Sequence, residues 1–304
     1  MRGFTPDSLQ RSMRPLHVAL AVLVAAIWGI AFVISKIGLE SFTPAQLTAL
    51  RFMVAAVVAI WLPRPQIPLK FLISIGLTVF TGQFLFQFFG IAKGMPAGLT
   101  AVVVQTQALF TVVFAAFAIG DRPSTQQVVG MVTAFIGLLM IGLTLGAGVT
   151  AVGFTLTLAA AVSWAIGNVL VKRLPKVDML HLMVWASLVP PIPALAISFV
   201  LEGPESLLNA LAGASWLGVA APIYLGLLAS VVAYAVWGNL LQQYSTAAVA
   251  PFALLSPVLG AITSALVFGE RFEPLRLAGM TSILIGVAIV ALPLHRFALT
   301  RARS

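Results

Sequence analysis

The stretch AAIWGIAFVISK at Ala25–Lys36 decides the fold, because the chain contains nearly the same segment again as AVSWAIGNVLVK at Ala161–Lys172. In each stretch a Trp is followed eight residues later by a Lys, and the two copies lie 136 residues apart. Phe32 of the first copy is replaced by Asn168 in the second. The repetition predicts two copies of one structural unit.

The composition indicates a membrane protein. Of the 304 residues, 61% are hydrophobic and 8% are charged, whereas soluble domains are about a quarter charged. The chain has no Cys, which excludes disulfides and Cys-based metal sites. A net charge of +9 would suggest nucleic acid in a soluble protein. Here the basic residues lie between apolar runs, so we attribute the charge to membrane topology and expect no nucleic-acid partner.

Ten apolar runs are long enough to cross a bilayer, which takes about 20 helical residues. They lie at 16–35, 44–63, 69–91, 95–119, 125–144, 151–171, 179–201, 214–241, 246–268 and 274–294. The first run exceeds the ~7–15 apolar residues of a signal-peptide core, so we predict an uncleaved first span. With the N-terminus inside, twelve of the seventeen Lys and Arg residues fall on the inner side and four on the outer side. This bias predicts cytoplasmic N- and C-termini.

A second repetition defines the units. GDR at Gly120–Arg122 recurs as GER at Gly269–Arg271, 149 residues later. We predict an all-α integral membrane protein with ten transmembrane helices in two five-helix repeats around a central cavity. Its parts are a cytoplasmic tail (1–15), the first repeat (16–144), the second repeat (151–294) and a cytoplasmic tail (295–304). Because five is odd, the second repeat is inverted, an arrangement that in transporters places the substrate site near the midplane. A duplication that serves structure alone is the alternative.

No ionisable acid is placed at mid-membrane. The eight acids and the three His residues all lie in tails, in loops or at span ends. Proton relays usually need intramembrane Asp, Glu or His, so proton antiport through a carboxylate is disfavoured. The chain also lacks the GxxxxGK[ST] phosphate loop and the zinc motif HExxH. We therefore expect no catalysis, no cofactor and no metal site.

Uncharged polar and aromatic residues within the spans are the candidates for the cavity lining. Trp28 and Phe32 share a helix face, as do Trp164 and Asn168. Gln83 and Gln87 lie one helical turn apart, and Gln105 and Gln107 lie in the next span. Tyr234, Trp237, Asn239 and Ser256 are further candidates. The alternatives are lipid-facing or core-packed Trp, and Gln residues that only hydrogen-bond between helices. If Asn168 and Phe32 line opposite sides of the cavity, one side is polar and the other is apolar.

Three basic residues near or within the spans require an explanation. Lys36 and Arg51 are candidate partners for a substrate carboxylate. For Lys36 and Lys172 the alternative is snorkelling to the interface. For Arg51 it is pairing with a loop acid or with a helix C-terminus.

Prolines and glycines indicate flexible and close-packed places. Pro96, Pro190, Pro251 and Pro257 are candidate kink or gating positions, because proline removes a backbone donor. Gly130, Gly137, Gly279 and Gly286 predict close packing of the fifth span on the tenth.

Seven segments together resemble the drug/metabolite transporter superfamily. They are WGIAFVISKIGL (28–39), TALRFM (48–53), GMPAGLTAVVVQTQALFT (94–111), LTLAAAVSWAIGNVLVK (156–172), YAVWGNLL (234–241), VAPFALLSPVLG (249–260) and GER (269–271). The chain is most similar to the EamA-type ten-helix exporters of cysteine, O-acetylserine and other amino acids, with the aromatic amino-acid exporters close behind. The resemblance implies that spans 1–4 and 6–9 surround a cavity and that spans 5 and 10 are peripheral. The positions that match recurrent family positions are Trp28, Lys36, Arg51, Pro96, Gln105, Gln107, Trp164, Asn168, Pro257 and Glu270.

The resemblance implies inner-membrane export of amino acids and related metabolites by alternating access, in a bacterial inner (plasma) membrane. The short multidrug exporters of the same superfamily use a glutamate in the first helix, which this chain lacks, so zwitterions are favoured over dicationic toxicants. The expected partners are small amino-acid substrates and the lipid bilayer, and ten helices suffice for a monomer. The alternatives are a carrier of sugars, nucleobases or drugs, and a membrane enzyme or scaffold without transport.

Overall fold

The computed structural model describes residues 13–120, 123–146, 148–175 and 177–292, and over these residues it contains helices and no strands. Ten helical stretches in this part of the chain are long and apolar enough to cross a membrane, at Pro15–Gly38, Pro44–Trp61, Leu69–Ala92, Ala97–Ile119, Thr125–Gly142, Ala151–Lys172, Met179–Glu202, Trp216–Gln243, Ala248–Phe268 and Pro274–Ala291. The predicted all-α fold with ten spans is therefore confirmed. GDR at 120–122 reaches beyond the described residues, as do the two predicted tails.

Several spans are built from more than one helical segment. In chain order the elements are α1 (Pro15–Gly38), α2 (Pro44–Val57), η2 (Val58–Trp61), α3 (Leu69–Ile75), η3 (Gly76–Gly82), α4 (Gln83–Ala92), α5 (Ala97–Val103), η4 (Val104–Thr106), α6 (Gln107–Ile119), α7 (Thr125–Gly142), α8 (Ala151–Lys172), α9 (Met179–Ala186), α10 (Pro191–Glu202), α11 (Ser206–Gly213), α12 (Trp216–Ile223), η5 (Tyr224–Val232), α13 (Ala233–Gln243), α14 (Thr246–Ala253), α15 (Leu255–Phe268) and α16 (Pro274–Ala291).

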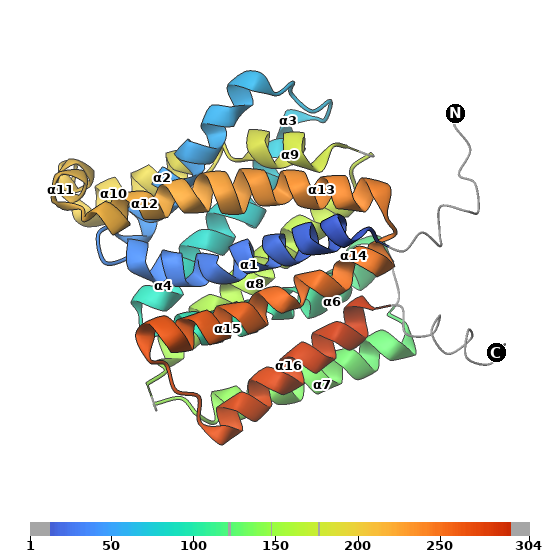
Figure 1. The fold of residues 1–304 in the computed structure, drawn as a ribbon. Coiled ribbons are helices and arrows are strands. Elements are labelled where there is room, and N and C mark those ends of the chain that lie inside the picture. The colour runs from blue at the N-terminus through green and yellow to red at the C-terminus, as the bar shows by residue number, and fades with distance from the viewer. Residues whose placement is uncertain (1–12, 121–122, 147, 176, 293–304) are drawn as a thin grey trace.

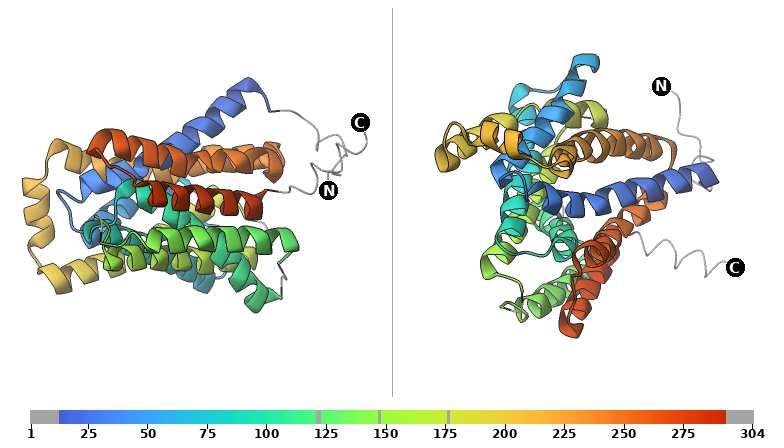
Figure 2. Two further views of the ribbon diagram at one scale, coloured as in Figure 1. Left: turned by 90° about the horizontal axis from the view of Figure 1, so that it is seen from below. Right: turned by 60° about the vertical axis from the view of Figure 1, so that its left-hand side comes forward.

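The spans form one bundle whose two ends differ. α1 begins and α16 ends at the same end of the bundle, and the short helix α11 lies at the opposite end (Figure 1). Figure 2 shows the same arrangement from two further directions. We call the end with Pro15 and Ala291 the terminal end, and the end with α11 the far end.

The two halves share local irregularities at matching places. The third and eighth spans each contain a π-helical segment, η3 and η5, and the fourth and ninth spans are broken at η4 and at Leu254. α6 and α15 both end at a glycine in the left-handed conformation, Gly120 with φ 70° and Gly269 with φ 66°. Only glycine adopts this conformation without steric cost. These matches support the interpretation of two copies of one unit.

The packing partners of the spans also match. α1 packs against α15 of the ninth span, and α8 packs against η4 and α6 of the fourth span. The first span of each half therefore contacts the fourth span of the other half: α1 meets the ninth span and α8 meets the fourth. α4 and η3 pack against α8, while α12, η5 and α13 pack against α1. The third span therefore packs against the sixth, and the eighth span packs against the first. The centre of the bundle is thus built from both halves.

The fifth and tenth spans, α7 and α16, pack against each other at one edge of the bundle (Figure 1). The seam depends on missing side chains: a Cβ on Gly137 would lie 2.5 Å from the carbonyl oxygen of Gly279, and a Cβ on Gly279 would lie 2.8 Å from that of Gly137. Ser282 Oγ adds a hydrogen bond of 2.8 Å to the Thr133 carbonyl. The predicted close packing of these two spans is confirmed.

Candidate functional site

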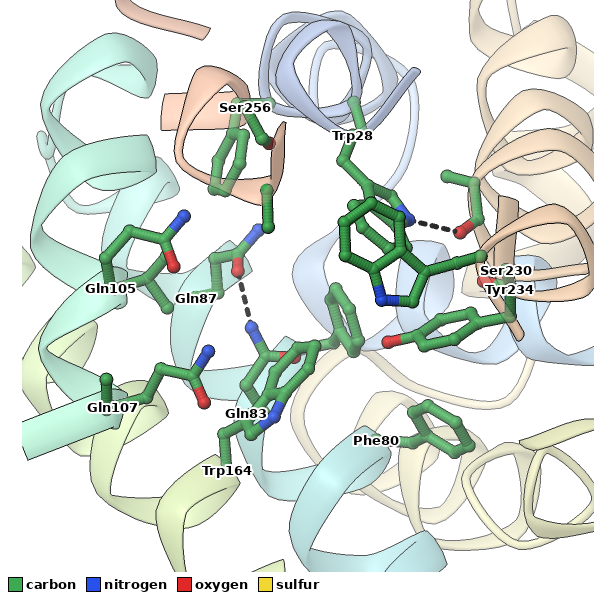
Figure 3. A pocket seen from close by; sticks show the side chains of 18 of the residues that line it. Trp28, Phe80, Gln83, Gln87, Gln105, Gln107, Trp164, Ser230, Tyr234 and Ser256 are labelled. Carbon is green, nitrogen blue, oxygen red and sulfur yellow. Dashed lines mark hydrogen bonds between the residues drawn. The ribbon is translucent and has the colours of Figure 1, made fainter. Parts of the chain in front are cut away.

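A cavity of about 480 Å³ lies between the two halves, within the ~300–1,000 Å³ typical of small-molecule sites. It is lined by residues of α1, α2, η3, α4, η4, α6, α8, η5, α13, α14 and α15, with Met179 of α9 and with Val287 and Ala291 of α16. The tenth span therefore contributes to the lining, although the family resemblance implies that it is peripheral. Figure 3 shows side chains from both halves converging on this space.

Ten of the twelve residues predicted to line a cavity do so. They are Trp28, Phe32, Gln83, Gln87, Gln105, Gln107, Trp164, Tyr234, Trp237 and Ser256. Asn239 is exposed on α13 and, like Asn168, does not line the cavity. Three further residues, Ser35, Ser230 and Leu241, line the cavity and were not predicted from the sequence. For Ser35 and Ser230, the signal available in the sequence was a single Ser within an apolar span.

Trp28 forms one aromatic wall of the cavity (Figure 3). Its Nε1 donates a 3.0 Å hydrogen bond to the Ala229 carbonyl within η5. Its ring lies 5.5 Å from Tyr234 and 5.3 Å from Trp237, measured between centroids. The Tyr224 hydroxyl returns a 3.0 Å hydrogen bond to the Ile27 carbonyl. Trp28 is therefore held by the π-helical segment of the other half and does not face lipid.

Trp164 forms the second wall of the cavity. Its hydrogen-bond partner Asn168 was predicted to line the cavity as well, and this prediction was wrong. The Trp164 Nε1 donates to Asn168 Oδ1 at 3.0 Å. The Asn168 Nδ2 donates to Gln107 Oε1 at 3.0 Å and to Thr111 Oγ1 at 3.1 Å. Asn168 is not among the residues that line the cavity, because its amide is engaged by its neighbours. It orients Trp164 and Gln107, and it does not itself supply a polar side to the cavity.

Four glutamine amides supply the neutral polar part of the lining. Gln83 Nε2 donates to Gln87 Oε1 at 2.7 Å, and Gln83 Oε1 is buried without a hydrogen-bond partner among the described residues. Gln107 is oriented through Asn168, and Gln105 faces the same space from η4 (Figure 3). An unpaired buried amide is costly in hydrocarbon, so a polar ligand or water in the cavity would relieve this cost.

Arg51 of α2 lines the cavity and is 3% exposed. Its Nη2 donates to the Leu225 carbonyl at 3.2 Å and to Ser230 Oγ at 3.0 Å. Its guanidinium carbon lies 3.9 Å from the centroid of the Phe84 ring. Both alternatives for Arg51 were wrong, since its partners are neither a loop acid nor a helix C-terminus. The carbonyl that it contacts belongs to the π-helical segment η5, and such segments are frequent at functional sites.

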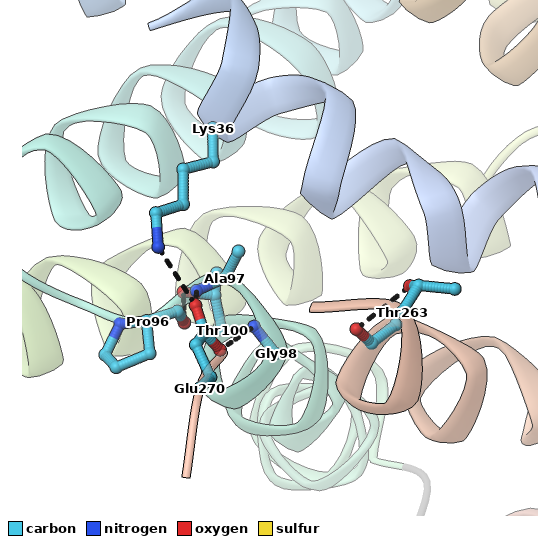
Figure 4. A network of polar contacts seen from close by, with 8 residues as sticks. Lys36, Pro96, Ala97, Gly98, Thr100, Thr263 and Glu270 are labelled. Carbon is cyan, nitrogen blue, oxygen red and sulfur yellow. Dashed lines mark hydrogen bonds and ion pairs between the residues drawn. The ribbon is translucent and has the colours of Figure 1, made fainter. Parts of the chain in front are cut away.

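Lys36 does not reach the cavity. Its Nζ lies 3.1 Å from Glu270 Oε1 and 4.0 Å from the Phe268 ring centroid, at the far end of the bundle (Figure 4). The Glu270 carboxylate also accepts hydrogen bonds from the backbone N–H of Ala97 at 3.0 Å and of Gly98 at 3.1 Å. These donors belong to the first turn of α5, where a helix favours negative charge. Lys36 therefore holds the two halves together through Glu270 and does not line the cavity.

The equivalent lysine and the prolines occupy helix ends and breaks. Lys172 is exposed in the last turn of α8. Pro96 precedes α5 as its N-cap residue, and Pro190 lies in the break between α9 and α10. Pro251 lies inside α14, and Pro257 lies in the first turn of α15. Three of the four prolines therefore adjoin a helix break or a helix start, where a missing N–H costs least.

Several residues that line the cavity lie near the terminal end of the bundle. Met179 begins α9, Leu241 lies near the end of α13 and Ala291 ends α16, so these lining residues are all close to the terminal end. At the far end the contacts between Glu270, Lys36 and the start of α5 join both halves (Figure 4). Within the described part of the chain no group of three or more His, Cys, Asp or Glu residues could hold a metal ion.

The chain is similar to known proteins along most of its length. It is 39% identical over 277 residues to the "Probable amino-acid metabolite efflux pump" of Escherichia coli (strain K12), which covers 89% of this chain and 93% of that protein. It is 40% identical to the protein of the same description from Salmonella typhimurium, with the same coverage. It is 27% identical to the "Uncharacterized inner membrane transporter YedA" of Escherichia coli (strain K12), over 94% of each chain.

A solved crystal structure shares the fold, with a TM-score of 0.60 and 19% sequence identity over 94% of this chain and 99% of that chain. The EamA-like transporter family matches this chain twice, at residues 16–143 and 151–292. With its ten apolar helices the protein is a multi-pass membrane protein of the bacterial inner membrane. The chain belongs to the EamA-like transporter family, and it is a membrane exporter of that type rather than an enzyme.

Proposed function

We propose that the protein exports amino acids and related small zwitterionic metabolites by alternating access. The observation that carries the proposal is the cavity of about 480 Å³ between the two halves, which contains amide and indole side chains and no carboxylate among its described lining residues. Transporters built from inverted repeats bind substrate near the midplane, at the interface of the repeats. The descriptions of the two most similar relatives reported above, as amino-acid metabolite efflux pumps, support the same substrate class.

The lining offers complementary chemistry for a small zwitterion. The glutamine amides can donate to a carboxylate and accept from an ammonium group. The indole faces of Trp28 and Trp164 can add cation–π contacts, which contribute ~0.5–2 kcal/mol each. The carbon skeleton of the substrate would pack against Phe32 and Phe84, which also line the cavity. Water exclusion by these rings strengthens each polar contact.

The conformation supports an inward-facing state of the cycle. Met179, Leu241 and Ala291 of the lining lie near the terminal end, and the ion pair of Lys36 with Glu270 joins the two halves at the far end. The bias of Lys and Arg toward the inner segments predicts that the termini are cytoplasmic. On this orientation the substrate enters from the cytoplasm, and rocking of the halves opens the far end to the outside. A monomer suffices, since one chain encloses the cavity.

Transport in proteoliposomes tests the proposal. The panel comprises labelled amino acids together with a sugar, a nucleobase and a cationic dye, and the variants are Trp164→Ala, Gln107→Ala and the control Trp61→Ala. Trp61 is 71% exposed in η2 and lies away from the cavity. We expect at least one amino acid to be transported, both cavity variants to lower its rate at least fivefold, and the control to match wild type.

The outcomes separate the alternatives. If the sugar, the nucleobase or the dye is transported and no amino acid is, the protein carries another metabolite class. If both cavity variants leave every flux unchanged, the lining assignment is wrong. Because the described lining has no carboxylate, we expect movement down the substrate's own gradient without an imposed proton gradient, and a strict requirement for such a gradient would contradict this part.

A further inference from the structure

Arg51 is a fixed positive charge within a membrane span. It lies in the middle of α2 and is 3% exposed, yet it lines the cavity. A buried charge in a membrane span is costly unless it is paired, and such residues usually mark substrate or ion pathways. The question is therefore which anion compensates this charge.

Among the residues that the structure describes, none supplies an anion to Arg51. Its two hydrogen bonds, both from Nη2, go to the neutral Leu225 carbonyl and to the Ser230 hydroxyl. Nε is buried without a partner among the described residues. The rings around it, Phe84 at 3.9 Å and Phe52 at 5.0 Å, are uncharged. A guanidinium has five N–H donors, so part of its donor set is available to a ligand while Nη2 holds it in place.

The position of the guanidinium is fixed from both halves of the chain. Ser230 Oγ donates to the Leu225 carbonyl at 2.8 Å and at the same time receives the hydrogen bond from Arg51. Both groups belong to η5, the π-helical segment of the eighth span, whereas Phe84 belongs to α4 of the first half. Such an arrangement orients a planar donor for a carboxylate, which guanidinium groups bind in a bidentate manner.

The described residues of the cavity lining offer no negatively charged partner for the α-ammonium group of an amino acid. The described lining residues include one cation, Arg51, and no Asp or Glu. An ammonium group would meet neutral acceptors such as the amide oxygens of the glutamines that line the cavity. The charge of the cavity is therefore balanced by a ligand with one net negative charge and is left unbalanced by a zwitterion.

We propose that Arg51 binds the substrate carboxylate and that the cavity accepts monoanionic carboxylates without an α-ammonium group, such as N-acyl amino acids, at least as well as the parent zwitterions. This inference rests on the proposed function, since it assumes that the cavity is the transport site. It has an energetic consequence: outward movement of a monoanion carries negative charge down an inside-negative membrane potential. Export of such substrates is therefore driven by the potential, whereas export of a zwitterion is independent of it.

The test uses three probes with one side chain: L-leucine, N-acetyl-L-leucine and L-leucinamide. Binding to the purified protein is followed by quenching of tryptophan fluorescence, and transport is followed in proteoliposomes with and without a potassium diffusion potential. We expect N-acetyl-L-leucine to bind at least as tightly as L-leucine, and L-leucinamide to bind at least tenfold more weakly. An inside-negative potential should accelerate efflux of N-acetyl-L-leucine at least threefold and should leave L-leucine efflux unchanged.

The variants are Arg51→Gln, Arg51→Lys and the control Arg64→Gln, which removes an exposed charge between the second and third spans. We expect Arg51→Gln to lose at least tenfold in affinity for N-acetyl-L-leucine, Arg51→Lys to retain part of it, and the control to match wild type. Elution as a single species in gel filtration establishes that each variant folds.

Failure of this inference is distinguishable from failure of the proposed function. If wild type neither binds nor transports N-acetyl-L-leucine while amino acids are transported, the inference is wrong and the proposed function stands. The inference is also overturned if L-leucinamide binds as well as N-acetyl-L-leucine, or if Arg51→Gln keeps the wild-type affinity. If none of the three probes binds and no amino acid of the panel moves, both are wrong.

Discussion

Lys36 of α1 and Glu270, which follows α15, form an ion pair with Nζ 3.1 Å from Oε1, and this pair joins the two halves of the chain at the far end of the bundle. The same carboxylate accepts the first backbone N–H groups of α5. One side chain therefore connects three elements, α1, α5 and the segment after α15. In the proposed alternating-access cycle the far end opens for export, and these contacts then break.

Replacing Glu270 by Gln should favour opening of the far end. The change removes the charge that holds Lys36 and weakens the charge-assisted contacts to α5, each of which contributes about 1.5–3 kcal/mol. The chain has no Cys, so Ser256→Cys gives a single reporter within the cavity. We expect a membrane-impermeant thiol reagent, added from the outside of cells, to label this reporter at least threefold faster in Glu270→Gln. Glu273→Gln, at an exposed position nearby, should leave the rate unchanged, and equal labelling in both variants would contradict the assignment of the closed end.

Replacing Asn168 by Leu should weaken substrate binding although Asn168 does not line the cavity. The change removes the acceptor for Trp164 Nε1 and the donor for Gln107 Oε1, and each lost hydrogen bond costs about 0.5–1.5 kcal/mol. We expect KM for the transported substrate to rise roughly five- to tenfold with kcat nearly unchanged. Thr111→Val, which removes only one of the Asn168 contacts, should have a smaller effect. A wild-type KM in Asn168→Leu would show that neither side chain depends on this amide.

Replacing Trp28 by Phe should lower stability more than its change in size suggests. Phe keeps an aromatic ring beside Tyr234 and Trp237 but loses the donor to the Ala229 carbonyl. The carbonyl remains in a buried π-helical segment, so we expect a loss of about 1–3 kcal/mol and a lower midpoint of thermal unfolding in detergent. Trp216→Phe is the matched control, since Trp216 is 77% exposed. Equal midpoints for the two variants would refute a structural role of the indole N–H.

Replacing Gly137 by Val should separate α7 from α16. A Cβ at this position would lie 2.5 Å from the Gly279 carbonyl oxygen, and overpacking of a close interface costs about 1–3 kcal/mol. We expect a lower amount of folded protein in the membrane and a lower thermal midpoint. Gly142→Val, where a Cβ would meet no atom within 4 Å, should behave as wild type. If the two variants are equally stable, the seam does not hold the peripheral pair together.

The amino-acid sequence by itself determined the membrane class, the ten spans and most of the cavity lining. The membrane class and the ten spans depend on hydropathy and on run length, which are local and survive any rotation of a helix about its axis. The repeated Trp–Lys segments also indicated which spans are equivalent. Ten of the twelve predicted lining residues line the cavity, and all of them except Phe32 carry a polar group, which is costly to leave unsatisfied against lipid.

Only the tertiary structure decided the partners of these side chains. Asn168 and Gln107 lie 61 residues apart, and Lys36 and Glu270 lie 234 residues apart, so no local pattern relates them. The π-helical segment η5 changes the rotation of the eighth span and exposes the Leu225 carbonyl to Arg51. Helix rotation and helix breaks depend on packing between the two halves, since neither half encloses the cavity alone. For this reason the sequence revealed the polar residues of the spans. It did not reveal which of them line the cavity and which orient the lining residues.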